Sequence, residues 1–381
     1  MASVSFPGGS VVYITDTGSS ISYRLSSSSS PSDITWPFTI SNLTPSADPV
    51  IIEFTTDITL SSESNQYFVC GSDKIQFGST SLKEDGSRPI ITIDGIANYP
   101  GLIMNGTLIN PGKNNIHIFN LEVHTANGAT LVSSGGWIAQ QYFGLATSNN
   151  YILNCHSTGE IFGGSGGIVG ANTGNLTVTG CSSSGLIHQV GGGIVGAYAG
   201  GTNGNIICNS CWSSGVILPF GGGIFGDYAG DDAGMATAIN CYSTGIIGDN
   251  GGGIYSRYAG NSGQAVAQNC YSRGNIGTDA GGIFGSSAGS NSGITNAIIC
   301  YSNGAVTTAG NGIYGTSKGI GSITTNCYIA EGSWDTTAAT AMLTGTPSPP
   351  SIVGNTWIAT GMNQPSELTM MGYTPYSEGA P

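Results

Sequence analysis

The sequence predicts an all-β protein, a parallel β-helix (β-solenoid) with N- and C-terminal caps. Two observations lead to this prediction: cysteines recur about every thirty positions, and glycine and isoleucine occupy fixed positions between them. The third is composition, because 63 of the 381 residues are glycine and only 8% are charged. Glycine is thus more than twice as frequent as in an average domain, and charged residues are about three times rarer.

Six cysteines define the repeat, and Cys327 opens a shorter seventh copy. The six are Cys155, Cys181, Cys211, Cys241, Cys270 and Cys300, at spacings of 26, 30, 30, 29 and 30 residues. Counted from each cysteine, the fourth, twelfth and nineteenth residues are glycine, and the sixth is isoleucine or valine. The thirteenth residue is always isoleucine: Ile168, Ile194, Ile224, Ile254, Ile283 and Ile313. All variation in length falls after the last of these glycines, which predicts one insertion-tolerant loop per repeat.

The repeat favours a coil of short strands over helices. Each copy contains β-prone runs between glycines and no uninterrupted apolar stripe of helical period. Glycine costs about 1 kcal/mol inside a helix, whereas at a sharp corner it reaches positive φ without penalty. Coils of this kind stack in parallel about 4.8 Å apart, so the equivalent isoleucines would form a column that fills the interior. The alternative, a β-propeller, needs blades of about 40–50 residues.

The cysteines would form another column in such a stack. We expect their thiols to be reduced and buried, because free cysteine packs like a small hydrophobic residue and parallel in-register positions seldom offer disulfide geometry. Cys208 and Cys211 form a single C-x-x-C pair without a second pair or clustered histidines. We therefore expect no metal site and no cofactor.

Four regions are expected along the chain. Residues 1–48 do not repeat and are interpreted as an N-terminal leader and cap, and residues 49–150 as irregular early coils. Residues 151–330 hold the regular coils, and residues 331–381, where the pattern ends, are assigned to a C-terminal cap and tail. Caps are expected because an open end would expose an unpaired strand edge.

The charge of the chain argues against two kinds of partner. The formal net charge is −13, and no lysine or arginine occurs between Lys113 and Arg257. Phosphate backbones require clustered cations, so we expect no nucleic-acid binding. No run reaches the about eighteen apolar residues of a membrane-spanning helix, so we expect no membrane insertion. Met1–Ser10 also lack the basic and apolar segments of a signal peptide.

One stretch of the repeat resembles a known family. The sequence NCYSTG at Asn240–Gly245, followed by GGGI at residues 251–254, resembles GLUG-type repeats. These occur in surface or virion proteins of giant DNA viruses and in bacterial adhesins. Ser333–Thr337, Leu343–Pro347 and Thr356–Trp357 are similar to a segment that follows such repeats in giant-virus proteins. The resemblance covers about residues 150–360; it implies a β-solenoid on a virion or cell surface and implies no catalytic residues.

Aromatic residues recur at two positions of the repeat and are the candidate binding residues. The residue after the cysteine is aromatic in the last four of the six full copies: Trp212, Tyr242, Tyr271 and Tyr301. The seventeenth residue is aromatic in three: Tyr198, Tyr228 and Tyr258. If the cysteines point inward, strand alternation turns the following residues outward, where aromatic rings could stack on sugars. The alternative is that stacked rings only stabilise neighbouring coils.

Asp249 and Asp279 are the best candidates for a catalytic pair, because several parallel β-helices cleave polysaccharides with carboxylates on adjacent coils. Both lie in the variable turn of the repeat. A glycoside hydrolase needs two carboxyls about 5 to 9.5 Å apart, but solvated aspartates are also common in glycine-rich turns.

We therefore expect a non-enzymatic structural protein of a virion or surface fibre, with adhesive contacts to a glycan or host surface. The expected partners are other virion or surface proteins, further copies of the chain, and glycan. The expected location is a virion or extracellular surface. The alternative is a polysaccharide-degrading β-helix enzyme, either a lyase or a glycoside hydrolase.

Overall fold

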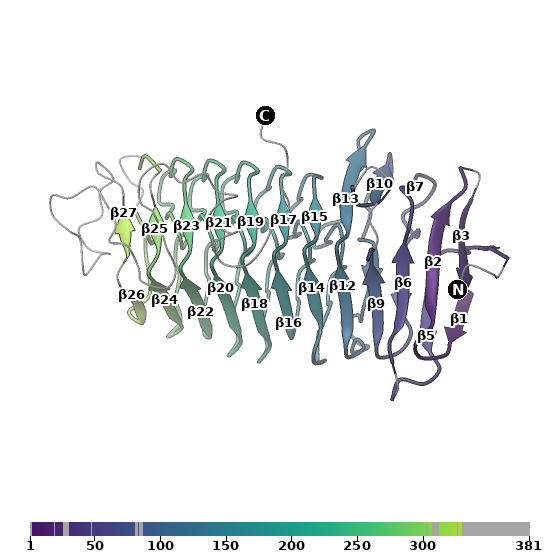
Figure 1. Ribbon diagram of the computed structural model, residues 1–381. Coiled ribbons are helices and arrows are strands. Elements are labelled where there is room, and N and C mark those ends of the chain that lie inside the picture. The colour runs from purple at the N-terminus through teal and green to yellow at the C-terminus, as the bar shows by residue number, and fades with distance from the viewer. Residues whose placement is uncertain are drawn as a thin grey trace.

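The chain folds into one elongated stack of coils with the N-terminal strand at one end (Figure 1). The computed structural model describes residues 2–18, 20–25, 30–46, 48–80, 83, 87–302, 304–306, 312–325 and 327–329. All secondary structure in these ranges is β, and no helix is present that could cross a membrane. The predicted parallel β-solenoid is confirmed. The predicted C-terminal cap, residues 331–381, lies outside the described residues.

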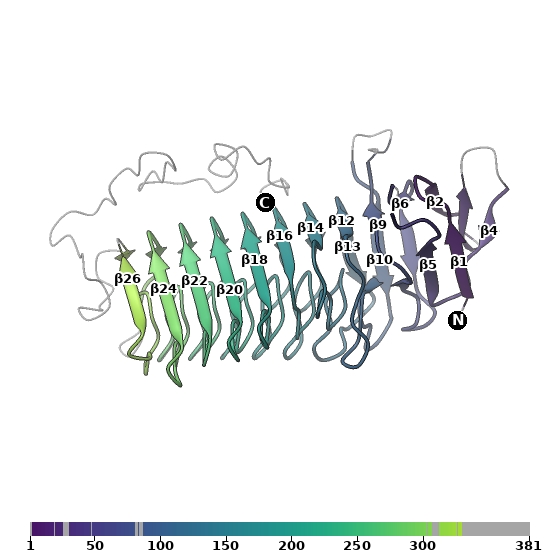
Figure 2. The same ribbon diagram turned by 90° about the horizontal axis from the view of Figure 1, so that it is seen from below.

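Three sheets run along the stack. The longest contains, in spatial order, β26 (Ser322–Thr325), β24 (Ile294–Ile298), β22 (Gln264–Gln268), β20 (Met235–Ile239), β18 (Asn205–Asn209), β16 (Leu176–Thr179), β14 (Tyr151–Leu153), β12 (Ile116–Phe119), β9 (Ile75–Gly78), β6 (Val50–Phe54), β2 (Val11–Asp16), β3 (Ile21–Leu25) and β4 (Ser32–Asp33). Its strands from β12 to β26 lie side by side in Figure 2.

The second sheet contains β27 (Tyr328–Ile329), β25 (Tyr301–Ser302), β23 (Tyr271–Ser272), β21 (Tyr242–Ser243), β19 (Trp212–Ser213), β17 (Ser182–Ser183), β15 (His156–Ser157), β13 (Glu122–Ala126), β10 (Ile90–Asp94) and β7 (Ile58–Leu60). The third contains β1 (Ala2–Phe6), β5 (Phe38–Asn42), β8 (Phe68–Cys70) and β11 (Ile103–Met104). Isolated parallel bridges continue the third sheet along the regular coils, for example between Val195 and Phe225.

One coil shows how the repeat produces this path. After β20, Asn240 turns the chain with a left-handed φ of 55°, a conformation that asparagine tolerates better than most residues. The chain passes Cys241 into β21 and returns through a glycine-rich run. At Gly253 a Cβ atom would collide with the carbonyl oxygen of Gly282 on the next coil. The fixed glycine at this position thus permits the close approach of two coils.

The core is a continuous apolar column along the stack. It includes the thirteenth residue of every regular coil, as predicted, and each of these side chains is 0% exposed: Ile168, Ile194, Ile224, Ile254, Ile283 and Ile313. The sixth residues pack in a second, smaller cluster: Ile161, Ile187, Ile217, Ile247 and Ile276, together with Ala280. The coil therefore has a main core and a side compartment, where the sequence predicted one interior.

The cysteines are free and buried, as predicted from their spacing. The Cys241 thiol donates to the carbonyl oxygens of Ile239, at 3.2 Å, and of Cys208, at 3.4 Å. The same arrangement recurs at Cys270 and Cys300. Burial raises the pKa of the Cys241 and Cys270 thiols, which disfavours the reactive thiolate.

The N-terminal end combines a coil with capping strands. Strand β1 pairs in parallel with β5, and β2 pairs in parallel with β6, so solenoid winding begins before the irregular region expected at residue 49. Strands β3 and β4 then add antiparallel to the edge of β2. These two strands cover an edge that would otherwise be open to another chain.

The core position is tested by comparing two isoleucines of one coil. Ile254 is 0% exposed and Ile246 is 55% exposed. We predict that Ile254→Ala lowers the free energy of unfolding by about 2–5 kcal/mol, because it leaves a cavity in a packed column. Ile246→Ala should change it by less than about 0.5 kcal/mol. Denaturant unfolding followed by circular dichroism measures both, and equal effects would contradict the assignment of the core.

The state of the cysteines is tested with Ellman's reagent. We predict that none of the nine thiols reacts promptly in the native protein, because all are buried. All should react once the chain is unfolded in guanidinium chloride. The variant Asn205→Cys, at an exposed position, should add one fast-reacting thiol as a control. Rapid native reaction of several thiols in the unaltered chain would contradict the buried column.

Candidate functional site

The predicted aromatic residues after the cysteines do form a column, which we call the strand column: Trp212, Tyr242, Tyr271 and Tyr301. The rings of Trp212, Tyr242 and Tyr271 are parallel, with centroids 5.8 Å apart for Trp212–Tyr242 and 4.8 Å apart for Tyr242–Tyr271. The expectation of an exposed ladder was wrong for Trp212, Tyr242 and Tyr271, which are only 9%, 3% and 6% exposed. Tyr301, at the end of the column, is half-buried. In these three residues the stacked rings cover one another, so the flat surfaces that a sugar would contact are occupied by neighbouring rings.

A second aromatic column, not anticipated from the sequence, lies inside the core. This core column consists of Phe225, Tyr255, Phe284 and Tyr314, with centroids 4.8–4.9 Å apart. The hydroxyl of Tyr255 lies 2.9 Å from the carbonyl oxygen of Ala236 and 2.7 Å from that of Val266. It therefore donates a hydrogen bond although it is fully buried.

The core column was missed because each of its residues directly follows a buried isoleucine. In a straight strand, adjacent side chains point to opposite faces, so the residue after Ile254 would point outward. The chain instead bends here, and both Ile254 and Tyr255 are buried. The sequence did carry an indication, since the fourteenth residue of the regular coils is valine, phenylalanine or tyrosine throughout.

The tyrosines at the seventeenth position form an accessible column, which we call the corner column: Tyr198, Tyr228 and Tyr258. Ring centroids are 5.1 Å apart for Tyr198–Tyr228 and 4.7 Å apart for Tyr228–Tyr258. Tyr198, at the end of the column, is 46% exposed. All three residues have left-handed φ, between 55° and 58°. A bulky side chain is unusual in this backbone conformation, which favours glycine or asparagine.

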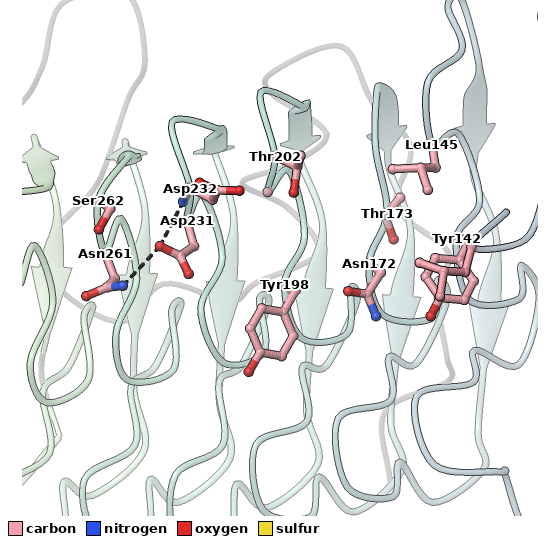
Figure 3. Close-up of a pocket in the computed structure, with 12 residues that line it drawn as sticks. Tyr142, Leu145, Asn172, Thr173, Tyr198, Thr202, Asp231, Asp232, Asn261 and Ser262 are labelled. Carbon is pink, nitrogen blue, oxygen red and sulfur yellow. Dashed lines mark hydrogen bonds between the residues drawn. The ribbon is translucent and has the colours of Figure 1, made fainter. Parts of the chain in front are cut away.

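Tyr198 of the corner column lines a groove of about 550 Å³ that crosses several coils (Figure 3). Its wall includes Tyr198, Asp231, Asp232 and Asn261. The Asp231 carboxylate accepts hydrogen bonds from the Asp232 backbone N–H, at 2.7 Å, and from Asn261 Nδ2, at 3.0 Å. These bonds hold the carboxylate and amide in place beside the exposed ring.

The hydrogen-bonded row that begins with Asp231 and Asn261 continues on the next coil. Asn261 is only 9% exposed, and its Oδ1 accepts hydrogen bonds from Ser290 Oγ, at 3.1 Å, and from Asn291 Nδ2, at 2.9 Å. Because both sides of its amide are engaged, its orientation is determined by the network. The sequence interpretation assigned no binding role to Asp231 or Asn261, which lie in the loop of variable length where no repeat pattern marks them.

The structure gives the predicted catalytic pair two different positions in the turn. Asp279 occupies a left-handed corner with φ of 57°, as does Asn250 with φ of 59° on the preceding coil. Asp249 lies one residue earlier, and its Oδ1 accepts a hydrogen bond from the Thr278 backbone N–H at 2.8 Å. Asp249 thus has a local structural role in joining two coils.

A buried ion pair lies beside the corner column. Asp227 Oδ2 is 3.0 Å from Arg257 Nε, and the Asp227 side chain is 5% exposed. The guanidinium also lies over the rings of Phe220, at 4.5 Å, and Tyr258, at 5.3 Å. Burial raises the pKa of Asp227 from 3.8 to about 7, and this effect outweighs the opposing attraction to Arg257. Arg257 therefore links the tyrosine corner to a carboxyl group that takes up a proton near neutral pH.

No group of three or more histidine, cysteine, aspartate or glutamate side chains is gathered within the described ranges in a way that could hold a metal ion. The Cys208–Cys211 pair belongs to the buried packing, since both residues are 0% exposed. The groove is therefore best described by its aromatic, carboxylate and amide groups.

These coils and columns define the class of the protein: it is a parallel β-solenoid of tandem repeats. No family model, curated protein or solved structure matches the chain.

The Asp227–Arg257 pair predicts a dependence of stability on pH. Between about pH 4 and pH 7 the folded chain retains a proton on Asp227 that the unfolded chain has lost. The proton on Asp227 therefore stabilises the folded chain fully below about pH 4, and this stabilisation is lost as the pH rises through about 7. Each unit of difference between the folded and the unfolded pKa corresponds to about 1.4 kcal/mol. Asp227→Asn should remove this component, as measured by denaturant unfolding at several pH values.

The control for this measurement is Asp232→Asn, at an exposed position on the next loop, which should retain the decline. An Asp227→Asn variant with the same pH dependence as the unaltered chain would show that Asp227 ionises normally in the fold.

Proposed function

We propose that the protein is a non-enzymatic structural element of a virion or surface fibre that makes adhesive contacts with glycans. The observation that carries the proposal is Tyr198, the exposed end of the corner column, beside an ordered row of carboxylate and amide groups. Aromatic faces accept the apolar side of a sugar ring, and carboxylate and amide oxygens accept its hydroxyl protons.

The structural part of the proposal follows from the repeat architecture. Each coil pairs only with its neighbours, so stability adds along the stack and length increases with the number of coils. The location on a virion or surface fibre is drawn from the resemblance to GLUG-type repeats. Exposed apolar residues at one position of adjacent coils, Val216 at 42% and Ile246 at 55%, support association with further copies or with other surface proteins.

The alternative enzymatic function has less support. Glycoside cleavage needs two positioned carboxyls across the scissile bond. Of the candidate pair, Asp249 is already engaged by the backbone of Thr278, and Asp279 occupies a different position of its turn. The balance of observations thus favours binding over bond cleavage.

Glycan binding is tested on a carbohydrate array with the full chain. We predict binding to a subset of glycans and a loss of at least about tenfold in affinity for the double variant Tyr198→Ala, Tyr228→Ala, which corresponds to about 1.4 kcal/mol. Tyr151→Ala is the matched control, because this tyrosine is also exposed, at 36%, but lines a different part of the surface. An array without any bound glycan would contradict the adhesive part of the proposal.

Location is tested separately by mass spectrometry of purified virions and of cell-surface fractions from the source. We expect enrichment of peptides from the regular coils in one of these fractions. Recovery only in internal soluble fractions would contradict a surface role, whatever the array shows.

A further inference from the structure

The corner column has a gap at Asn172. The backbone N–H of each corner residue donates to the carbonyl oxygen of the residue that precedes the next corner. Tyr142 donates to Ala171 at 3.0 Å, Asn172 to Ala197 at 2.8 Å, and Tyr198 to Asp227 at 2.7 Å. Tyr142, Asn172 and Tyr198 also share a left-handed φ of 57–66°. They are therefore equivalent positions on three consecutive coils, and the middle one carries a short amide where its neighbours carry rings.

Among the described residues, no ring stacks on the face of Tyr198 that adjoins this gap. Its other face stacks on Tyr228 at 5.1 Å with an interplanar angle of 4°. The open face looks toward the coil that carries Asn172. In Figure 3, Asn172 lies between Tyr198 and Tyr142, and all three residues line the groove.

The size of the gap matches a single six-membered ring. Rings in the corner column repeat at 4.7–5.1 Å, and two coil spacings amount to about 9.6 Å. A ring placed above Asn172 would therefore lie about one coil spacing from each flanking corner. We propose that this gap binds one pyranose unit of a neutral glycan, stacked on Tyr198; the inference rests on the glycan-binding function proposed above.

The charge around the gap selects the class of sugar. The groove carries the Asp231 and Asp232 carboxylates, and none of the described residues that line it is basic. Uronic, sialic or sulfated sugars would meet like charge without a compensating cation. Neutral hexoses offer hydroxyl donors, which the oxygen of the Asn172 amide accepts at the gap. Asp231 lies farther along the groove, on the other side of Tyr198 from Asn172 (Figure 3).

The test is a variant that fills the gap with an aromatic ring and leaves Tyr198 in place. Asn172→Tyr places a seventeenth-position tyrosine at a corner whose neighbours already carry tyrosine with the same φ, so the fold should tolerate it. We expect at least a tenfold loss of affinity for the neutral oligosaccharide that binds most strongly on the array, with an unchanged or higher Tm. Tyr198→Ala should cause a similar loss by removing the stacking face.

Ser287→Tyr is the matched control. Ser287 occupies the equivalent corner after Tyr258, with φ of 58°, so the variant extends the column at its other end and leaves the gap open. Its affinity for the same oligosaccharide should stay within about twofold of the unaltered chain, because the contacts in the gap are unchanged.

The outcomes separate this inference from the broader proposal. If neutral glycans bind equally well to the unaltered chain, Asn172→Tyr and Tyr198→Ala, the gap is not the site, although glycan adhesion stands. If the chain binds no glycan, the proposed adhesive function is contradicted, and the inference about the gap, which rests on it, is contradicted as well. Preferential binding of anionic glycans, or of aromatic peptides instead of sugars, with loss in Asn172→Tyr would locate the site correctly but overturn the neutral sugar as its ligand.

Discussion

Parallel hydrogen bonding between equivalent residues of successive coils is the interaction on which the rest of the structure depends. It places every side chain directly above its counterpart at one coil spacing, as in the pairing of Tyr242 with Tyr271. Any residue type repeated at one position therefore becomes a column, whether of isoleucine, cysteine or tyrosine. The columns on the inner side of the sheets form the continuous apolar core and supply the interior contacts that hold the coils together. Glycines such as Gly253 allow neighbouring backbones to approach closely enough for this pairing.

The same stacking gives aromatic columns different roles according to where the coil bends. Stacked rings in the strand and core columns shield one another and contribute to cohesion between coils. The corner column stacks in the same way, yet its position at the corner leaves it accessible, as the 46% exposure of Tyr198 shows. A change of residue type within such a column, as at Asn172, interrupts the stack. The sugar site proposed above lies at this local departure from the repeat.

The sequence predicted the fold well because its repeat length, glycine positions and thirteenth-position isoleucines are all consequences of one coil geometry. Burial of the cysteines followed from the same argument, since an in-register column of thiols packs without forming disulfides. The candidate site was predicted only in part. Tyr198, Tyr228 and Tyr258 were identified as a column, but Asp231 and Asn261 lie in the loop where repeat length varies. Their hydrogen bond joins two coils, and sequence spacing does not reveal such a contact.

What the sequence by itself determined is the period, and hence which residues lie above one another. What only the tertiary structure decided is the direction in which each column points. Strand alternation assigned the ring after each cysteine to an open face, but Tyr242 is buried, and the bend at Ile254 and Tyr255 turns two consecutive side chains into the core. Periodicity specifies the spacing of residues along the stack, whereas exposure depends on bends and packing within each coil, and these form only when the whole coil closes around its core.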